Sequence, residues 1–108
     1  LSLLAASNFK LACASNSIKE SINRILIKLD IKKYFSFIVG NDEVSIPKPS
    51  PEMYNKCMLH FGVSPQETLA IEDSEIGLQT INNANVCGLM VKNRQDLTLE
   101  KIYQAIQI

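Results

Sequence analysis

The sequence predicts an α/β fold in which a parallel sheet lies between helices, as a three-layer α/β/α arrangement. Short apolar runs typical of buried parallel strands alternate with stretches whose apolar residues recur at helical spacing. Turn or helix-capping residues follow each apolar run, as in strand–helix–strand units. The chain of 108 residues suits one domain, residues 1–108.

Composition excludes several classes of protein. Hydrophobic residues make up 46% of the chain, which argues against disorder, and no run of about 18 apolar residues could span a membrane. The formal net charge is zero, and Asp30 and hydrophobic neighbours dilute the densest basic cluster, Lys28, Lys32 and Lys33. Nucleic acid is therefore not an expected partner. The three cysteines form no C-x-x-C pair, which favours reduced thiols rather than a disulfide. Reduced thiols in turn indicate a cytoplasmic location.

The N-terminal part predicts a helix end, a strand and a second helix. Residues 1–8 resemble the last turns of a helix, and residues 10–14 form a short apolar run suited to a buried strand. Residues 15–17 supply turn and capping chemistry for an amphipathic helix over 17–29. A strand over 25–29 is the weaker alternative, because it would divide the apolar stripe of that helix.

The middle of the chain predicts a strand, a stiff loop and a helix. Residues 34–39 combine aromatic and β-branched side chains and stop at a Gly-Asn-Asp turn. Three prolines within residues 46–51 stiffen the loop and keep it out of a sheet. Ser50 is expected to cap the next helix, whose packing stripe consists of Tyr54, Cys57, Met58 and Phe61.

A third strand, over residues 68–71, runs directly into two adjacent carboxylates, Glu72 and Asp73. Like charges this close are costly unless a cation or hydrogen-bond donors compensate them, and magnesium prefers carboxylate oxygens. Ser74 is expected to cap a helix over 74–83. For this stretch alone, two solvated acids before a well-capped helix remain the alternative interpretation.

The last part completes the alternating pattern. Residues 86–91 predict a fourth strand. A closing helix is expected after it, with an apolar stripe of Leu99, Ile102, Tyr103 and Ile106.

Right-handed crossovers should bring polar residues from three strand ends to one edge of the sheet. Ser15 follows the first strand, Lys48 lies in the loop after the second, and Glu72 and Asp73 end the third. A hydroxyl donor, a cation on a stiff loop and two carboxylates suit a site that handles phosphate with magnesium. The alternatives are a solvated loop lysine at Lys48 and a helix cap at Ser15.

Three segments in this order resemble three of the four signature motifs of the haloacid dehalogenase-like (HAD) phosphohydrolases, in the β-phosphoglucomutase and phosphoglycolate phosphatase branch. Residues 12–17 (Ala-Cys-Ala-Ser-Asn-Ser) are similar to the second motif and residues 48–54 (Lys-Pro-Ser-Pro-Glu-Met-Tyr) to the third. Residues 71–74 (Ile-Glu-Asp-Ser), with Gly77, are similar to the fourth. The resemblance spans nearly the whole chain and implies a Rossmann-like core domain in a magnesium-dependent phosphatase or phosphomutase that acts on a small phosphorylated metabolite.

The resemblance also implies a role for each candidate residue. Ser15 and the backbone N–H of Asn16 would hold the oxygens of the transferred phosphoryl group. Lys48 would neutralise the phosphate and the attacking carboxylate. Asp73 would bind Mg²⁺, with Glu72 beside it directly or through water.

One motif of the family has no counterpart in this chain. In the family, a D-x-D motif at the end of a central strand provides the nucleophile and the acid/base, and this sequence contains no D-x-D. The chain opens at Leu1, and residues 1–8 match the helix that leads into the second strand of the family. We therefore expect the C-terminal portion of a core domain, truncated so that it lacks the central strand and the mobile cap domain.

Loss of a central strand has structural and functional consequences. It should leave two strand pairs with unpaired inner edges, through which the chain could self-associate. The chain alone should be inactive. The alternative is a degenerate, non-catalytic relative that binds phosphate or a protein. A receiver-like phosphoacceptor domain is a poorer alternative, because Asp42 lies in a turn.

Overall fold

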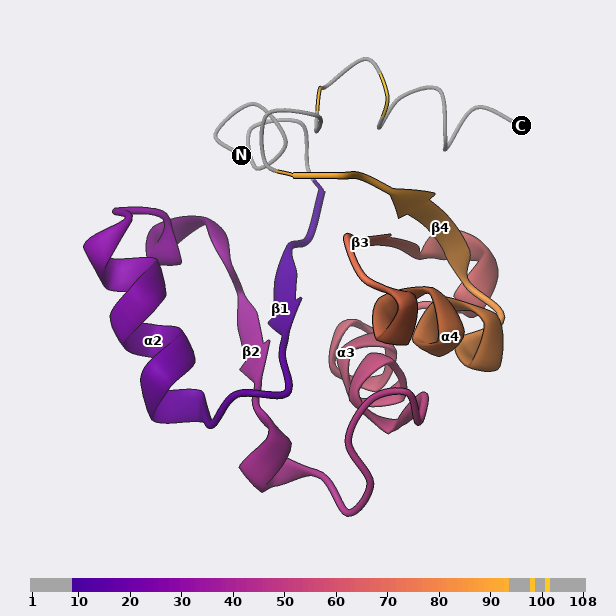
Figure 1. The fold of residues 1–108 in the computed structure, drawn as a ribbon, viewed down its shortest axis with the longest axis horizontal. Helices are drawn as coiled ribbons and strands as arrows, with labels where there is room; N and C mark the ends of the chain where they lie inside the picture. Colours follow the sequence, from indigo (N-terminus) through magenta and orange to yellow (C-terminus); the bar gives the residue numbers. More distant parts are fainter. Residues whose placement is uncertain (1–8, 94–97, 99–100, 102–108) are drawn as a thin grey trace.

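The computed structural model describes residues 9–93, 98 and 101 (Figure 1). The expectations for residues 1–8 and for the apolar stripe of the closing helix lie outside the described residues. The helices and strands are, in chain order, β1 (Ala12–Ala14), α2 (Lys19–Lys28), β2 (Phe37–Val39), α3 (Glu52–Phe61), β3 (Leu69–Glu72), α4 (Glu75–Ala84) and β4 (Cys87–Met90). Short 3₁₀ turns lie at Lys32–Tyr34, Asn41–Glu43 and Pro65–Glu67.

The strands form two separate parallel pairs, which confirms both the α/β class and the division into two pairs. Strand β1 pairs with β2, and β3 pairs with β4. In the described part of the chain, no strand joins one pair to the other. The free edges of β1 and β3 are therefore unpaired among these residues.

Two apolar clusters cover opposite faces of the β1–β2 pair. Successive strand residues point to opposite faces, and in β2 Ile38 packs with α2 whereas Val39 packs with α3 and α4. Figure 1 shows α2 on the far side of β1 and β2 from α3. The larger cluster is made of Val39, Met53, Tyr54, Met58, Ile81, Ala84 and Val86. Because α3 and α4 both contribute to it, this cluster connects the two strand pairs.

The predicted apolar stripe of α2, made of Ile18, Ile22, Ile25, Leu26 and Leu29, is only partly buried. Ile22 and Leu26 are buried, whereas Ile18, Ile25 and Leu29 are exposed, so the prediction was wrong for these three. In the cluster under α2, Ile22 and Leu26 pack against Ile38 of β2. None of the described clusters includes the three exposed residues of the stripe.

The start of α2 is capped by a later part of the chain, so the prediction of a cap within residues 15–17 was wrong. The N-cap residue is Ile18, which has no capping side chain, and the backbone N–H of Lys19 donates to Asp42 Oδ1 at 3.0 Å. A Cβ on Gly40 would lie 2.6 Å from the Lys19 nitrogen and 2.8 Å from the carbonyl oxygen of Ser17. The turn after β2 and the start of α2 therefore pack backbone against backbone, which requires glycine at this position.

The other helix ends follow the sequence more closely. Helix α3 has Pro51 at its N-cap position, one residue after the predicted cap, although Ser50 Oγ still accepts a bond from the Glu52 N–H at 3.3 Å. It ends at Gly62, whose φ of 66° is left-handed. Ser74 Oγ accepts from the Gly77 N–H at 3.1 Å, which confirms the predicted cap of α4.

Two further observations concern the cysteines and the lengths of the helices. All three cysteines are free, and burial raises the pKa of Cys57 to about 11, so that this thiol stays protonated near neutral pH. Among the described residues, no helix combines the length and the apolar character needed to cross a membrane.

The cap at Asp42 makes a stability prediction. Asp42→Ala leaves the first N–H of α2 without its acceptor and should lower the free energy of unfolding by about 1 kcal/mol. Urea denaturation followed by circular dichroism measures this. Gln79→Ala, at an exposed position of α4, is the control and should be nearly neutral. Equal effects of the two substitutions would show that Asp42 does not cap the helix.

Candidate active site

Hydrogen bonds from two helices hold the loop that carries Lys48. The Glu52 carboxylate accepts backbone N–H bonds from Ser45 at 2.9 and 3.1 Å and from Ile46 at 3.1 Å, and these bonds lower the pKa of Glu52. On the other side, Asn83 Nδ2 donates to the carbonyl oxygen of Pro49 at 2.8 Å. The start of α3 and the end of α4 thus fix the loop between β2 and α3.

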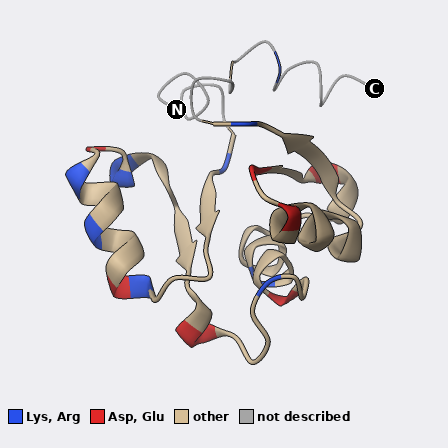
Figure 2. Cartoon of the chain, in the orientation of Figure 1, with Lys and Arg blue, Asp and Glu red and all other residues tan. Residues whose placement is uncertain are grey.

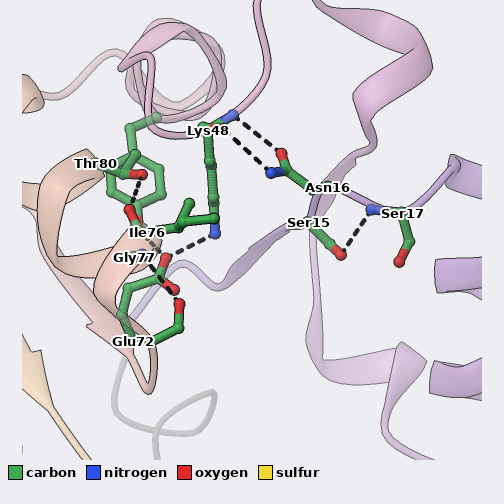
Figure 3. A network of polar contacts seen from close by, with 10 residues as sticks. Ser15, Asn16, Ser17, Lys48, Glu72, Ile76, Gly77 and Thr80 are labelled. Carbon is green, nitrogen blue, oxygen red and sulfur yellow. Dashed lines mark hydrogen bonds and ion pairs between the residues drawn. The ribbon is translucent and has the colours of Figure 1, made fainter.

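Asn16 fixes the backbone of Lys48 directly. The Lys48 N–H donates to Asn16 Oδ1 at 3.0 Å, and Asn16 Nδ2 donates to the Lys48 carbonyl oxygen at 3.3 Å (Figure 3). The two residues lie 32 positions apart in the chain. The side chain of Asn16 therefore connects the end of β1 to the loop that carries Lys48, two of the three segments expected to meet at this edge.

The Lys48 side chain ends in an ion pair with Glu72. Lys48 Nζ lies 2.7 Å from Glu72 Oε2, and only 10% of the lysine side chain and 12% of the glutamate side chain are exposed (Figure 3). Figure 2 shows acidic residues where β3 passes into α4, the position from which Glu72 reaches the lysine. The predicted convergence of Lys48 and Glu72 is thus present in the structure.

Tyr54 contacts both members of this pair. Its hydroxyl donates to Glu72 Oε2, and its ring centroid lies 5.3 Å from Lys48 Nζ, within the range of a cation–π contact. Burial, together with the neighbouring Glu72 carboxylate, raises the pKa of Tyr54 far above its ordinary value. The phenol therefore remains a hydrogen-bond donor at neutral pH.

Gly77 provides the space that the Glu72 side chain occupies. A Cβ at Gly77 would lie 2.4 Å from Glu72 Oε1 and 2.6 Å from Glu72 Cβ. An alanine in the first turn of α4 would therefore displace the carboxylate. The glycine of the fourth motif accommodates a side chain of the same motif.

Ser15 and Asp73 are placed by the same strand ends but lie outside this network. The Ser15 N–H donates to the carbonyl oxygen of Val39 at 3.1 Å, and its Oγ accepts from the Ser17 N–H at 3.1 Å. In the described part of the chain, no hydrogen bond uses the Ser15 hydroxyl proton or the backbone N–H of Asn16, so both donors are available to a ligand. Asp73 is exposed, directly after β3.

The carboxylates available here suit magnesium better than a metal that requires a full set of protein ligands. Among the described residues, no three His, Cys, Asp or Glu side chains gather as a metal centre. Magnesium commonly binds through one or two carboxylates and keeps several waters. Glu72 and Asp73 fit such a site, as carboxylates adjacent in sequence at the end of β3.

Sequence reasoning missed two contacts of the candidate site. It assigned Tyr54 only to a packing stripe and gave Asn16 only a role for its backbone N–H. A tyrosine, rather than a phenylalanine, in a buried stripe is a usable signal, because a buried hydroxyl needs a partner. The side-chain bonds of Asn16 depend on loop geometry that residue spacing does not reveal.

The burial of the ion pair makes a second stability prediction. Lys48→Met should lower the free energy of unfolding by about 3 kcal/mol, because it leaves a largely buried carboxylate without its cation. Adding Glu72→Gln should restore part of this loss, with a coupling energy above about 1 kcal/mol in a double-mutant cycle measured by urea denaturation.

The matched control is Lys19→Met, which removes a more exposed pair with Glu43 at 3.3 Å. This surface pair should contribute at most about 1 kcal/mol. Equal losses for the two lysine variants would contradict the importance of burial at Lys48.

Comparisons with known proteins point to one family. A family model described as haloacid dehalogenase-like hydrolase matches residues 1–91. A phosphorylated carbohydrates phosphatase of Thermotoga maritima is 30% identical over 86 residues, covering 80% of this chain and 40% of that protein. A phosphoglycolate phosphatase of Aquifex aeolicus is 34% identical over 79 residues, covering 73% of this chain and 37% of that protein.

Solved structures show the same likeness. A β-phosphoglucomutase from Clostridium difficile has a TM-score of 0.81 and 28% identity, covering 95% of this chain and 51% of its own. The chain spans well under half of the length of the curated relatives above, at 40% and 37%. The matched family model covers most of the chain, and the chain belongs to the haloacid dehalogenase-like hydrolase family.

Proposed function

We propose that the gene product containing this chain is a cytoplasmic, magnesium-dependent phosphatase or phosphomutase that acts on a small phosphorylated metabolite. The observation that carries this proposal is the ion pair between Lys48 and Glu72 at the end of β3. Asn16 holds the backbone of Lys48, and Tyr54 holds the carboxylate of Glu72. The relatives named phosphatases and phosphoglucomutase support the reaction class.

In this proposal each residue acts through its charge or its hydrogen-bond donors. The Lys48 ammonium stabilises negative charge on the phosphoryl oxygens, because in a site of low dielectric a fixed cation acts strongly on developing charge. The Ser15 hydroxyl and the Asn16 backbone N–H donate to the same oxygens. Glu72 and Asp73 bind Mg²⁺, which supplies charge neutralisation when bound.

We propose that the nucleophile of the reaction lies in a part of the gene product outside residues 1–108, because these residues contain no D-x-D sequence. We therefore propose that this chain alone does not turn over substrate and binds Mg²⁺ only weakly.

A second candidate function is a non-catalytic module that binds a protein or a second copy of itself. The free edges of β1 and β3 favour it, because unpaired strand edges bind other strands. Such a module would have no use for a lysine positioned by two other segments of the chain.

The experiment compares the complete gene product with the chain of 108 residues on p-nitrophenyl phosphate. The gene product should turn over substrate with Mg²⁺, lose this activity in EDTA, and lose about 100-fold or more in kcat on Lys48→Ala. The chain alone should show no turnover above its own Lys48→Ala variant. Isothermal titration should find Mg²⁺ affinity for the chain no tighter than about millimolar, given only two carboxylates.

Turnover that persists in EDTA would contradict the magnesium proposal. A gene product with no phosphatase or mutase activity would favour the binding module. Micromolar Mg²⁺ binding by the chain alone would contradict an incomplete site.

A further inference from the structure

The two oxygens of the Glu72 carboxylate have different surroundings. Oε2 accepts two hydrogen bonds, from Lys48 Nζ and from the Tyr54 hydroxyl. In the described part of the chain, no hydrogen bond reaches Oε1, which lies against Gly77. The carboxylate is therefore held through one oxygen, and the other has no protein donor among these residues.

Tyr54 is the more rigid of the two donors. The residue is 7% exposed and belongs to the larger apolar cluster, between Met53 and Met58 on α3. A ring packed in this way cannot change rotamer without disturbing the core. Lys48, by contrast, reaches Glu72 through a long flexible side chain, from a loop residue whose backbone alone is fixed by Asn16.

Tyr54 also contacts the lysine. The ring centroid lies 5.3 Å from Lys48 Nζ, so the same side chain borders the carboxylate through its hydroxyl and the ammonium through its ring. A rigid residue that contacts both charged groups determines their relative placement.

We propose that Tyr54 is a positioning residue, which fixes the Glu72 carboxylate so that Oε2 faces Lys48 and Oε1 is left for a cation. The cation part of this proposal rests on the proposed function, whereas the placement of Lys48 and Glu72 does not. Glu72 then offers the cation a single oxygen, and Asp73 is left as the other carboxylate ligand. Loss of the Tyr54 hydroxyl frees the carboxylate to rotate and loosens Lys48.

The first test measures the reactivity of Lys48 in the chain itself. Each lysine is acetylated with limiting N-hydroxysuccinimidyl acetate, and peptide mass spectrometry gives the rate at each site. In Tyr54→Phe, which keeps the ring and removes the hydroxyl, Lys48 should react about fivefold faster or more, while Lys19 and Lys56 keep their rates.

Tyr34→Phe is the matched control. Lys33 Nζ lies 5.5 Å from the Tyr34 ring, so this tyrosine also borders a lysine, but no hydrogen bond in the described structure uses its hydroxyl. Tyr34→Phe should leave the rate at Lys48 unchanged. A rise at all lysines in Tyr54→Phe would mean unfolding, and Glu72→Gln then takes its place, with the same expected rise at Lys48 alone.

An unchanged Lys48 rate in a folded Tyr54→Phe or in Glu72→Gln overturns the proposal. A selective rise at Lys48 supports it, whatever reaction the protein catalyses.

The second test uses the complete gene product and separates positioning from general stability. In Tyr54→Phe, kcat should fall about tenfold and the Mg²⁺ concentration for half-maximal activity should rise, while KM for the phosphorylated substrate changes less than about twofold. Unchanged Mg²⁺ dependence overturns the cation role of Oε1. If the wild type shows no Mg²⁺-dependent turnover, both the proposed function and the cation role of Oε1 fail. The labelling result then tests by itself whether Tyr54 fixes the placement of Lys48 and Glu72.

Discussion

The contact on which the candidate site depends is the ion pair between Lys48 and Glu72. It joins the loop after β2 to the end of β3, two segments that belong to separate strand pairs. Removing both charges from water is costly, and the cost is offset only where the geometry is good and further hydrogen bonds satisfy the same atoms. Tyr54 meets this requirement at the carboxylate, and Asn16 holds the backbone of Lys48 in place.

The apolar core and the polar site share a residue, so the two are not independent. Tyr54 packs with Met58 and Ile81 in the cluster that connects α3 and α4, and its hydroxyl lies at the ion pair. The core thus sets the position of the phenol, and the phenol limits the positions open to Glu72. Because interiors are close-packed, a volume change around α3 would be felt at the charged groups.

The sequence was informative where a short pattern determines the outcome. Apolar runs located the four strands, and the expectation that the strand ends share one edge correctly brought Lys48 to Glu72. The capping serine of α4 was also predictable, because its bond is local. Such features depend on residue types and on their spacing.

The features that could not be predicted depend on contacts between distant segments. Asp42 caps a helix that begins 23 residues earlier, and only the packing of Gly40 against the start of α2 makes this possible. The exposed side of the α2 stripe likewise depends on what packs beside the helix. Helical periodicity identifies an apolar face without saying how much of it a neighbour covers.

Gly77 sets helix stability against site geometry at a single position. Glycine inside a helix costs about 1 kcal/mol relative to alanine, and α4 bears this cost in the turn where Glu72 needs room. A search for more stable variants of this protein that is guided by helix propensity alone would choose alanine here. Helix propensity and the placement of the Glu72 carboxylate are thus opposing demands on one residue, and engineering for stability should leave it unchanged.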